Sequence, residues 1–211
     1  TNAQVVDFAD VVFLAVKPQF LEEVLDEIKD NVKEGQIFIS IAPGKTLQWL
    51  GEHLGEGTKI IRTMPNTPAM VGEGMTALCV NKQVTEQETL LAVTLCNTFG
   101  KTEVIPEHLM DAVVGVSGSS PAYVFMFLEA MADAAVADGM PRAQAYKFAA
   151  QAVLGSAKLM LETGKHPGEL KDMVCSPAGT TIQAVRVLEE KGLRSAVIEA
   201  QMECVKKAKG M

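Results

Sequence analysis

The first half of the chain alternates short apolar runs with helical segments, and this alternation restricts the possible folds more than any other feature. Residues 11–16 and 37–41 are nearly continuous apolar runs, which is typical of parallel strands covered on both faces. Proline or glycine ends each run, and apolar residues at helical spacing follow. Further strands are expected at residues 60–64, 76–80 and 102–105. This order predicts a doubly wound α/β sheet within residues 1–107.

From residue 108 onward the pattern predicts helices and no strand, so residues 108–211 are expected to form an all-α domain. Prolines stand near the helix starts and glycines near the helix ends. The expected helices cover residues 121–138, 141–163, 180–191 and 193–209, with a short turn at 167–173.

The helix over residues 122–136 carries only Glu129 and Asp133 as charges and is apolar on most of its circumference. Such a helix must be buried, and a domain of about 100 residues seldom encloses one completely. We therefore expect a large subunit interface in an intertwined helical dimer. The alternative is a small monomeric bundle with this helix at its centre.

Composition argues against several classes of partner. The net charge is −7 and no run of Lys or Arg exceeds a pair, so binding to nucleic acid or to an anionic membrane has little support. No apolar run approaches the roughly 20 residues that span a bilayer, and no signal peptide is visible, which favours a cytoplasmic protein. The four cysteines and three histidines are widely spaced, so no metal site is expected.

Residues 176–181, Ser-Pro-Ala-Gly-Thr-Thr, form a loop that opens directly into a helical pattern. The first N–H groups of a helix lack internal partners and the helix dipole adds positive potential, so this start suits a carboxylate or a phosphate. The alternative is an ordinary helix cap with a tight turn. A second stretch, residues 117–121, resembles the first, with Ser120 as expected N-cap and Pro121 as the first helical residue. Two such starts together indicate a site for a small acid.

Several longer stretches resemble the pyrroline-5-carboxylate reductase family. The similarity is carried, in chain order, by Phe-Leu-Ala-Val-Lys-Pro at 13–18, Met-Pro-Asn-Thr-Pro at 64–68, Gly-Ser-Ser-Pro-Ala-Tyr at 118–123, His-Pro-Gly at 166–168 and the run from Leu170 to Ala184. It covers essentially the whole chain. The resemblance implies an NAD(P)H-dependent imine reductase that performs the last step of proline biosynthesis. It also implies an N-terminal Rossmann domain, a C-terminal helical dimerisation domain and homodimers that often assemble into rings.

The resemblance also implies which residues form the site. The substrate, pyrroline-5-carboxylate, would be held by Ser176, Ala178, Gly179, Thr180 and Thr181, and by Ser119 and Ser120 from the facing helix start across the dimer. Thr181 would lie near the imine nitrogen and is the candidate catalytic residue. The cofactor, NADPH or NADH, would contact Asn2, Ala15, Val16, Lys17, Pro18, Ile41, Ala42, Pro43 and Asn66.

Three features depart from the family pattern. The phosphate-binding G-x-G-x-x-G loop and its strand are not in this sequence, which indicates a fragment that lacks the first roughly 30 or more residues of a βαβ unit. Residues that would distinguish NADH from NADPH are expected in that segment. Ala178 and Ser120 stand where glycine is common, and Ala178 would be strained only if its φ is positive.

The implied reaction transfers a hydride to the C=N carbon, and the protein supplies position and charge. Thr181 is a plausible hydrogen-bond donor to nitrogen, while water or prior protonation of the imine supplies the proton. One alternative is a related reductase of a hydroxy acid or another cyclic imine, using Lys158, Lys171 or His166 as acid or base. Another is a non-catalytic dimeric fragment.

Overall fold

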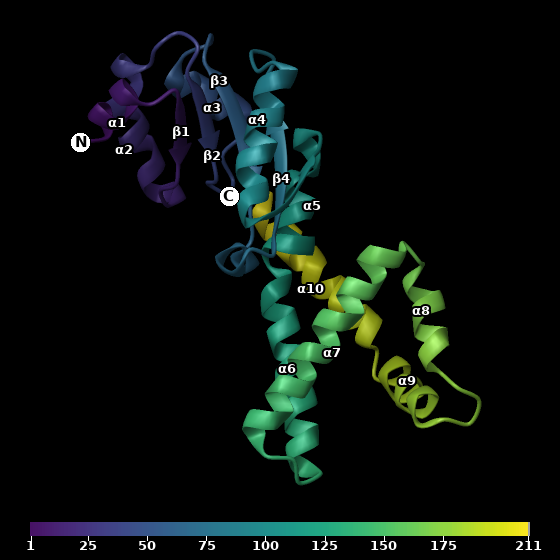
Figure 1. The fold of residues 1–211 in the computed structure, drawn as a ribbon. Coiled ribbons are helices and arrows are strands. Elements are labelled where there is room, and N and C mark those ends of the chain that lie inside the picture. Colours follow the sequence, from purple (N-terminus) through teal and green to yellow (C-terminus); the bar gives the residue numbers. More distant parts are fainter. Residues whose placement is uncertain (211) are drawn as a thin grey trace. The chain divides into compact units, whose positions relative to one another are not determined.

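The computed structural model describes residues 1–210, which form two compact units. The first unit comprises Thr1–Pro121 together with the C-terminal residues from Met202, and the second comprises Ala122–Gln201. Figure 1 shows a sheet with covering helices in the first unit and helices alone in the second.

The first unit contains one five-stranded sheet in the order β1-β2-β3-β4-β5. Its strands are β1 (Val11–Leu14), β2 (Ile37–Ser40), β3 (Lys59–Met64), β4 (Gly74–Val80) and β5 (Gly100–Val104). All neighbours pair in parallel except β3 and β4, which are antiparallel. Only the 3₁₀ turn η2 (Thr67–Val71) separates these two strands, and a parallel pair needs a longer crossover. The carboxyl ends of β1, β2 and β3 therefore share one edge.

Helices cover both faces of this sheet, which confirms the predicted α/β fold. Side chains of α1 (Asn2–Phe8), α2 (Pro18–Ile28) and α3 (Leu47–Leu54) share a core with Phe38 of β2 on one face. On the other face α4 (Glu86–Cys96) packs Ala92 against Ile39, Ile61 and Leu78. The predicted Thr85–Glu88 capping box begins α4.

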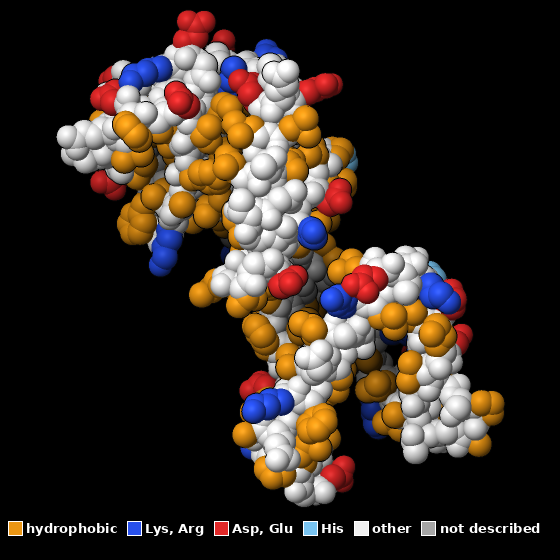
Figure 2. Space-filling view, in the orientation of Figure 1, with side chains coloured by type: hydrophobic (Ala, Val, Ile, Leu, Met, Phe, Trp, Pro, Cys, Tyr) orange, Lys and Arg blue, Asp and Glu red, His pale blue; other side chains and the backbone are white. Residues whose placement is uncertain are grey.

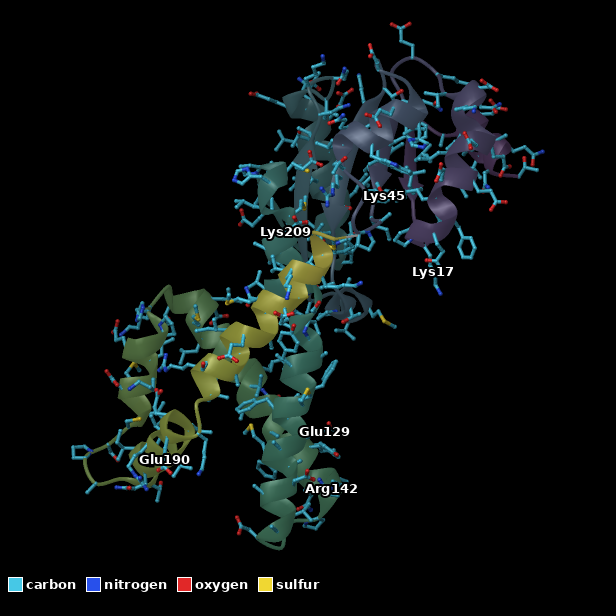
Figure 3. All side chains as sticks on the ribbon, turned by 180° about the vertical axis from the view of Figure 1, so that it is seen from behind. Lys17, Lys45, Glu129, Arg142, Glu190 and Lys209 are labelled. Carbon is cyan, nitrogen blue, oxygen red and sulfur yellow. The ribbon has the colours of Figure 1, made fainter. Side chains whose placement is uncertain are left out.

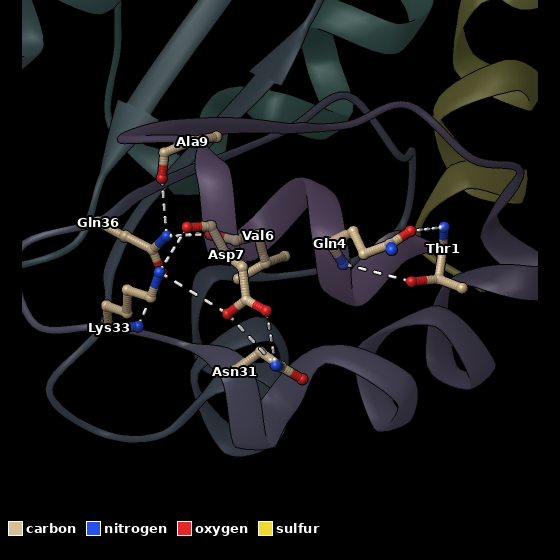
Figure 4. A network of polar contacts seen from close by, with 8 residues as sticks. All are labelled: Thr1, Gln4, Val6, Asp7, Ala9, Asn31, Lys33 and Gln36. Atoms are coloured by element: carbon tan, nitrogen blue, oxygen red, sulfur yellow. Dashed lines mark hydrogen bonds and ion pairs between the residues drawn. The ribbon is translucent and has the colours of Figure 1, made fainter.

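The short helix α1 was not predicted from the sequence, although a local capping box of Thr1 and Gln4 begins it; long-range hydrogen bonds hold its end (Figure 4). The buried Gln36 donates from Nε2 to the carbonyls of Val6 and Ala9, at 2.6 and 2.7 Å. Its Oε1 accepts from the Lys33 N–H at 2.7 Å. The Nε2 group thus fastens the turn between α1 and β1 to the start of β2, and Oε1 closes the local turn that precedes β2.

Residues 107–210 contain helices and no strand, as predicted. The elements of this half are η4 (Glu107–Leu109), α5 (Met110–Val113), the π-helix η5 (Val114–Gly118), α6 (Ser120–Ala137), α7 (Arg142–Thr163), α8 (Pro167–Val174), α9 (Thr180–Glu190) and α10 (Leu193–Ala208). The segment expected as a turn at 167–173 is the helix α8, whose first turn contains Pro167.

The apolar helix α6 is not buried within the chain, so it does not lie at the centre of a bundle, as the monomeric alternative required. Phe125 and Met126 are 62% and 68% exposed, and Ala132 is the one buried residue of the helix. Figure 2 shows hydrophobic side chains spread over the surface of the helical unit. The continuous helical run Glu107–Ala137 is also long and apolar enough to span a bilayer by length and composition alone, which corrects the expectation that no segment reaches that length.

Candidate active site

Three strands of the first unit bring their carboxyl ends into register. Leu14 pairs with Ser40, and Ser40 pairs with Arg62, so the residues that follow them lie along one edge of the sheet. Ligands of open α/β sheets bind at this edge. The structure therefore brings together the residues predicted to contact the cofactor from three strand ends, namely Ala15, Val16, Lys17, Pro18, Ile41, Ala42, Pro43 and Asn66.

Local hydrogen bonds fix the backbone at this edge. The Ile41 N–H donates to the Leu14 carbonyl at 3.3 Å, and the Thr63 hydroxyl donates to the Ser40 carbonyl at 3.0 Å. Lys17 is the N-cap residue of α2 but makes no side-chain capping bond, and Pro18 begins the helix. Figure 3 shows Lys17 extending away from the ribbon. An uncapped helix start beside a cation suits the negative charge of a dinucleotide, so these residues fit the cofactor.

Asn2 lies elsewhere in the unit. It is the first residue of α1, and its Nδ2 donates to Oε2 of Glu27 at 2.6 Å. Glu27 is near the end of α2, whereas Pro18 begins that helix, so about 14 Å of helix separates them. The structure does not group Asn2 with the other predicted cofactor residues, and its role stays a prediction.

Glu107 joins the edge of the sheet to a helix start, and sequence reasoning missed it. Its Oε1 accepts from Nη1 of the buried Arg62 at 3.0 Å and from the Leu47 N–H of α3 at 2.7 Å. Burial and, next, the Glu107 carboxylate raise the pKa of the neighbouring Cys79 to about 12, so that thiol stays protonated. No pattern of spacing connects residues 62 and 107, which meet only through the fold.

The predicted helix boundary at Ser120 is confirmed, since α6 begins there, but the predicted N-cap role of Ser120 and the free helix N-terminus are wrong. The helix runs through this position, and the preceding π-helix η5 is closed by the Ser119 N–H, which donates to the Val114 carbonyl at 2.8 Å. Ser120 donates from Oγ back to the Val116 carbonyl at 2.7 Å instead of capping a free end. Ser119 and Ser120 therefore offer hydroxyl groups but no helix N-terminus. The Ser119 Oγ also accepts from the Cys204 thiol at 3.0 Å.

Asn66 connects the edge of the sheet to η5. Its Nδ2 donates to the Ser117 carbonyl at 3.1 Å, and its Oδ1 accepts from the Met75 N–H at 2.8 Å. Both ends of its amide are thus used within the protein, and the serine segment is held beside the strand ends.

The loop at residues 176–181 belongs to the second unit and forms the predicted turn into a helix. Its Gly179 is the N-cap residue of α9, without a side-chain capping bond, and the Gly179 N–H donates to the Ser176 carbonyl at 3.0 Å. Ala178 has φ of 58°, the left-handed region that favours glycine, so the strain expected for a positive φ is present. A Cβ on Gly179 would lie 2.3 Å from the Ser176 Oγ. The α9 start is therefore open to an anion.

The comparisons with known proteins agree on one family. Residues 107–211 match the family model described as pyrroline-5-carboxylate reductase dimerisation, and residues 1–44 match one described as NADP oxidoreductase, coenzyme F420-dependent. The chain is 60% identical over 205 residues to pyrroline-5-carboxylate reductase of Escherichia coli, covering 97% of this chain and 76% of that protein.

Solved structures extend the similarity to the fold. A pyrroline-5-carboxylate reductase from Coxiella burnetii has a TM-score of 0.94 at 38% identity, covering 100% of this chain and 78% of that one. The Plasmodium falciparum pyrroline carboxylate reductase with NADP bound has a TM-score of 0.92 at 32% identity, covering 100% and 80%.

Proposed function

The chain belongs to the pyrroline-5-carboxylate reductase family, and we propose that it catalyses the NAD(P)H-dependent reduction of 1-pyrroline-5-carboxylate to L-proline, the last step of proline biosynthesis. The observation that carries this conclusion is the identity with the E. coli enzyme across nearly the whole chain. The strand edge offers a surface that suits a dinucleotide. The open start of α9 offers free N–H groups that suit a small carboxylate.

The cofactor-binding residues are proposed from the strand edge. When bound, NAD(P)H supplies the hydride. The uncapped start of α2 after Lys17 would attract its negative charge, and the backbone at Ala42 and Pro43 would line its path. Ala42 is almost completely buried, with its N–H bonded to the Ser40 hydroxyl at 3.3 Å, so this wall of the site is rigid. Asn66 and, at the ribose-phosphate end, Asn2 complete the proposed set.

The substrate-binding residues are proposed from the α9 start. The free N–H groups of Thr180 and Thr181 would hold the carboxylate, with the Ser176 hydroxyl beside them and Ala178 and Gly179 allowing close approach. Fixing the carboxylate orients the ring, and orientation is the main source of acceleration in such a reaction. Thr181 would donate a hydrogen bond at the imine nitrogen, and Ser119 and Ser120 would close the site from the other subunit.

A homodimer is proposed from the exposed helical surface. Apolar side chains line two hollows of about 560 and 580 Å³ within the second unit, one among α8, α9 and α10 and the other among α6, α7 and α8. A second copy would cover the apolar face of α6 and fill such hollows, and the match of residues 107–211 to a dimerisation model supports this arrangement. We also propose that the dimers assemble into rings and that the protein is cytoplasmic. The proposed domain boundary lies between residues 107 and 108.

The test is the loss of NADPH absorbance with pyrroline-5-carboxylate as substrate, measured on the complete polypeptide that contains these residues. We expect rapid oxidation that depends on this substrate and is inhibited by proline. A folded dimer that oxidises NADPH only with another cyclic imine or with a hydroxy-acid-forming substrate would contradict the assignment. A folded dimer that binds no dinucleotide would mark a non-catalytic protein.

A further inference from the structure

Pro121 leaves a backbone carbonyl without its helical partner. The N–H of residue 121 would donate to the Ser117 carbonyl in the α-helical register, or to the Val116 carbonyl in the π-helical register of η5, but proline has no N–H. The Val116 carbonyl accepts from the Ser120 hydroxyl, which leaves the Ser117 carbonyl. The helical run continues from Glu107 to Ala137, so this carbonyl lies inside the run and not at its end. Ser117 is partly buried, and such an acceptor requires another donor.

Asn66 provides that donor from the end of β3. Its Nδ2 lies 3.1 Å from the Ser117 carbonyl oxygen, and its Oδ1 lies 2.8 Å from the Met75 nitrogen. A carbonyl on one side and an N–H on the other determine which way the amide faces. Asn66 is therefore a fixed bridge between the sheet and the π-helix η5.

The π-helix in turn sets the two serines proposed for the substrate. The Ser119 N–H closes η5 on the Val114 carbonyl, and the Ser119 Oγ is held by the Cys204 thiol at 3.0 Å. Ser120 is tied to the Val116 carbonyl one turn earlier. π-turns of this kind are frequent at functional sites, where they aim particular side chains.

We infer that Asn66 is a positioning residue for substrate binding that acts through the Ser117 carbonyl. It replaces the N–H that Pro121 lacks and so holds η5 in the geometry that places Ser119 and Ser120. The inference rests on the proposed function, because these serines are its proposed substrate contacts. It assigns to the Asn66 amide a task separate from any contact of residue 66 with the cofactor.

The variant N66D tests this assignment in the complete polypeptide. An ionised carboxylate still accepts from the Met75 N–H but has no proton for the Ser117 carbonyl. We expect the KM for pyrroline-5-carboxylate to rise about tenfold, with a smaller change in kcat. Lowering the pH protonates the new carboxyl and restores a donor, so the ratio of variant to wild-type substrate KM should fall toward one.

Asn81 offers a matched control within the same sheet. Its Nδ2 donates to the Thr58 carbonyl at 2.8 Å, and its Oδ1 accepts from the Ile60 N–H at 3.1 Å. N81D therefore breaks the same kind of bridge away from the strand edge. It should lower thermal stability, regain it at low pH and keep the wild-type substrate KM.

A second variant tests the role of Pro121. P121A returns an N–H to the helix, so the Ser117 carbonyl depends less on Asn66. The increase in substrate KM caused by N66D should accordingly be several-fold smaller in the P121A background, measured as a double-mutant cycle.

Hydrogen exchange at the Ser119 amide gives a readout that does not require turnover. N66D should speed its exchange, and N81D should not. If the wild-type enzyme does not reduce pyrroline-5-carboxylate, the proposed function fails, and this exchange comparison alone decides whether Asn66 holds η5. Wild-type exchange and substrate KM in N66D, or an equal rise in KM in N81D, would overturn the inference.

Discussion

The two units of the chain differ in where their apolar surface goes. In the first unit, large side chains such as Leu25, Phe38 and Ile61 are fully buried between the sheet and its helices. Among the described residues of the second unit, the buried hydrophobic ones are three alanines, Ala132, Ala145 and Ala149. Larger apolar side chains there stay exposed, which leaves little burial to offset chain entropy. The sheet unit is stabilised by its own core, and the helical unit exposes the apolar surface that the proposed dimer would cover.

The proposed binding elements differ in the same way. At the strand edge, Asn66 and Glu107 connect segments 51 and 45 residues apart, so tertiary packing fixes that geometry. The loop at residues 176–181 is set by a single local bond from Gly179 to Ser176 and by the strained Ala178. The loop proposed for the substrate is therefore held by fewer long-range contacts within the chain than the strand edge is.

The largest effect is expected in the helical unit, where a substitution on α6 should abolish dimerisation. Phe125→Asp places a charge on the apolar face of α6 and removes roughly 2 kcal/mol of apolar burial per copy, so the dimer should dissociate at micromolar concentration. Leu90→Asp on α4 is the control, because Leu90 is exposed to a similar degree, 65% against 62%. Sedimentation equilibrium should find L90D dimeric and F125D monomeric; a dimeric F125D would refute the expected interface.

A smaller effect is expected from the ion pair in the sheet unit. Arg62→Met leaves the Glu107 carboxylate, which is one third exposed, without its buried partner and should lower the free energy of unfolding by about 1.5 kcal/mol. Trp49, the single tryptophan of the chain, lies on α3 and reports urea unfolding of this unit. Arg186→Met breaks an exposed pair with Glu190 and should change stability by less than about 0.5 kcal/mol. Equal effects of the two changes would argue against the importance of burial at Arg62.

The substrate loop supplies a paired test. Gly179→Ala puts a Cβ against the Ser176 hydroxyl, although its φ of −73° suits alanine, so steric displacement alone should raise the substrate KM by about tenfold. Ala178→Gly relieves a positive φ at the adjacent position and should stabilise the protein by less than about 1 kcal/mol. Steady-state kinetics on both variants checks the pair. An unchanged KM in G179A would remove this loop from the carboxylate site.

The smallest expected effect concerns acid stability of the sheet unit. Hydrogen bonds from Lys59 and then from the Thr85 backbone hold the pKa of Glu88 below its usual value. Its stabilising contribution is therefore present above the unfolded pKa of about 4.3 and is lost as the pH falls through the lower folded pKa. Glu88→Gln should lower stability at pH 7, and its difference from the wild type should shrink as the pH falls below the unfolded pKa. Glu86→Gln, which removes a charge from the same helical turn without breaking the Lys59 contact, should show a weaker pH dependence in urea titrations.

Periodicity predicted the elements of the fold, because apolar runs and Pro or Gly boundaries are local signals. It failed where a distant group completes the structure. The Gln36 amide holds the end of helix α1, and Asn66 satisfies the Ser117 carbonyl just before α6. Pro121 does lie in the first turn of α6, but the π-helix η5 leads directly into that turn, so the free helix start expected there does not exist. The open start of α9 was predicted because its turn residues are adjacent in the sequence.

Hydrogen exchange measured by mass spectrometry over a range of protein concentrations tests most directly whether the two units are stabilised differently. On dilution through the dimer dissociation constant, the amides of α6, α7 and α9 should lose protection while those of β2 and β3 keep it. Protection that falls equally in both units, or that does not depend on concentration in either, would contradict the claim that a second copy completes the helical unit.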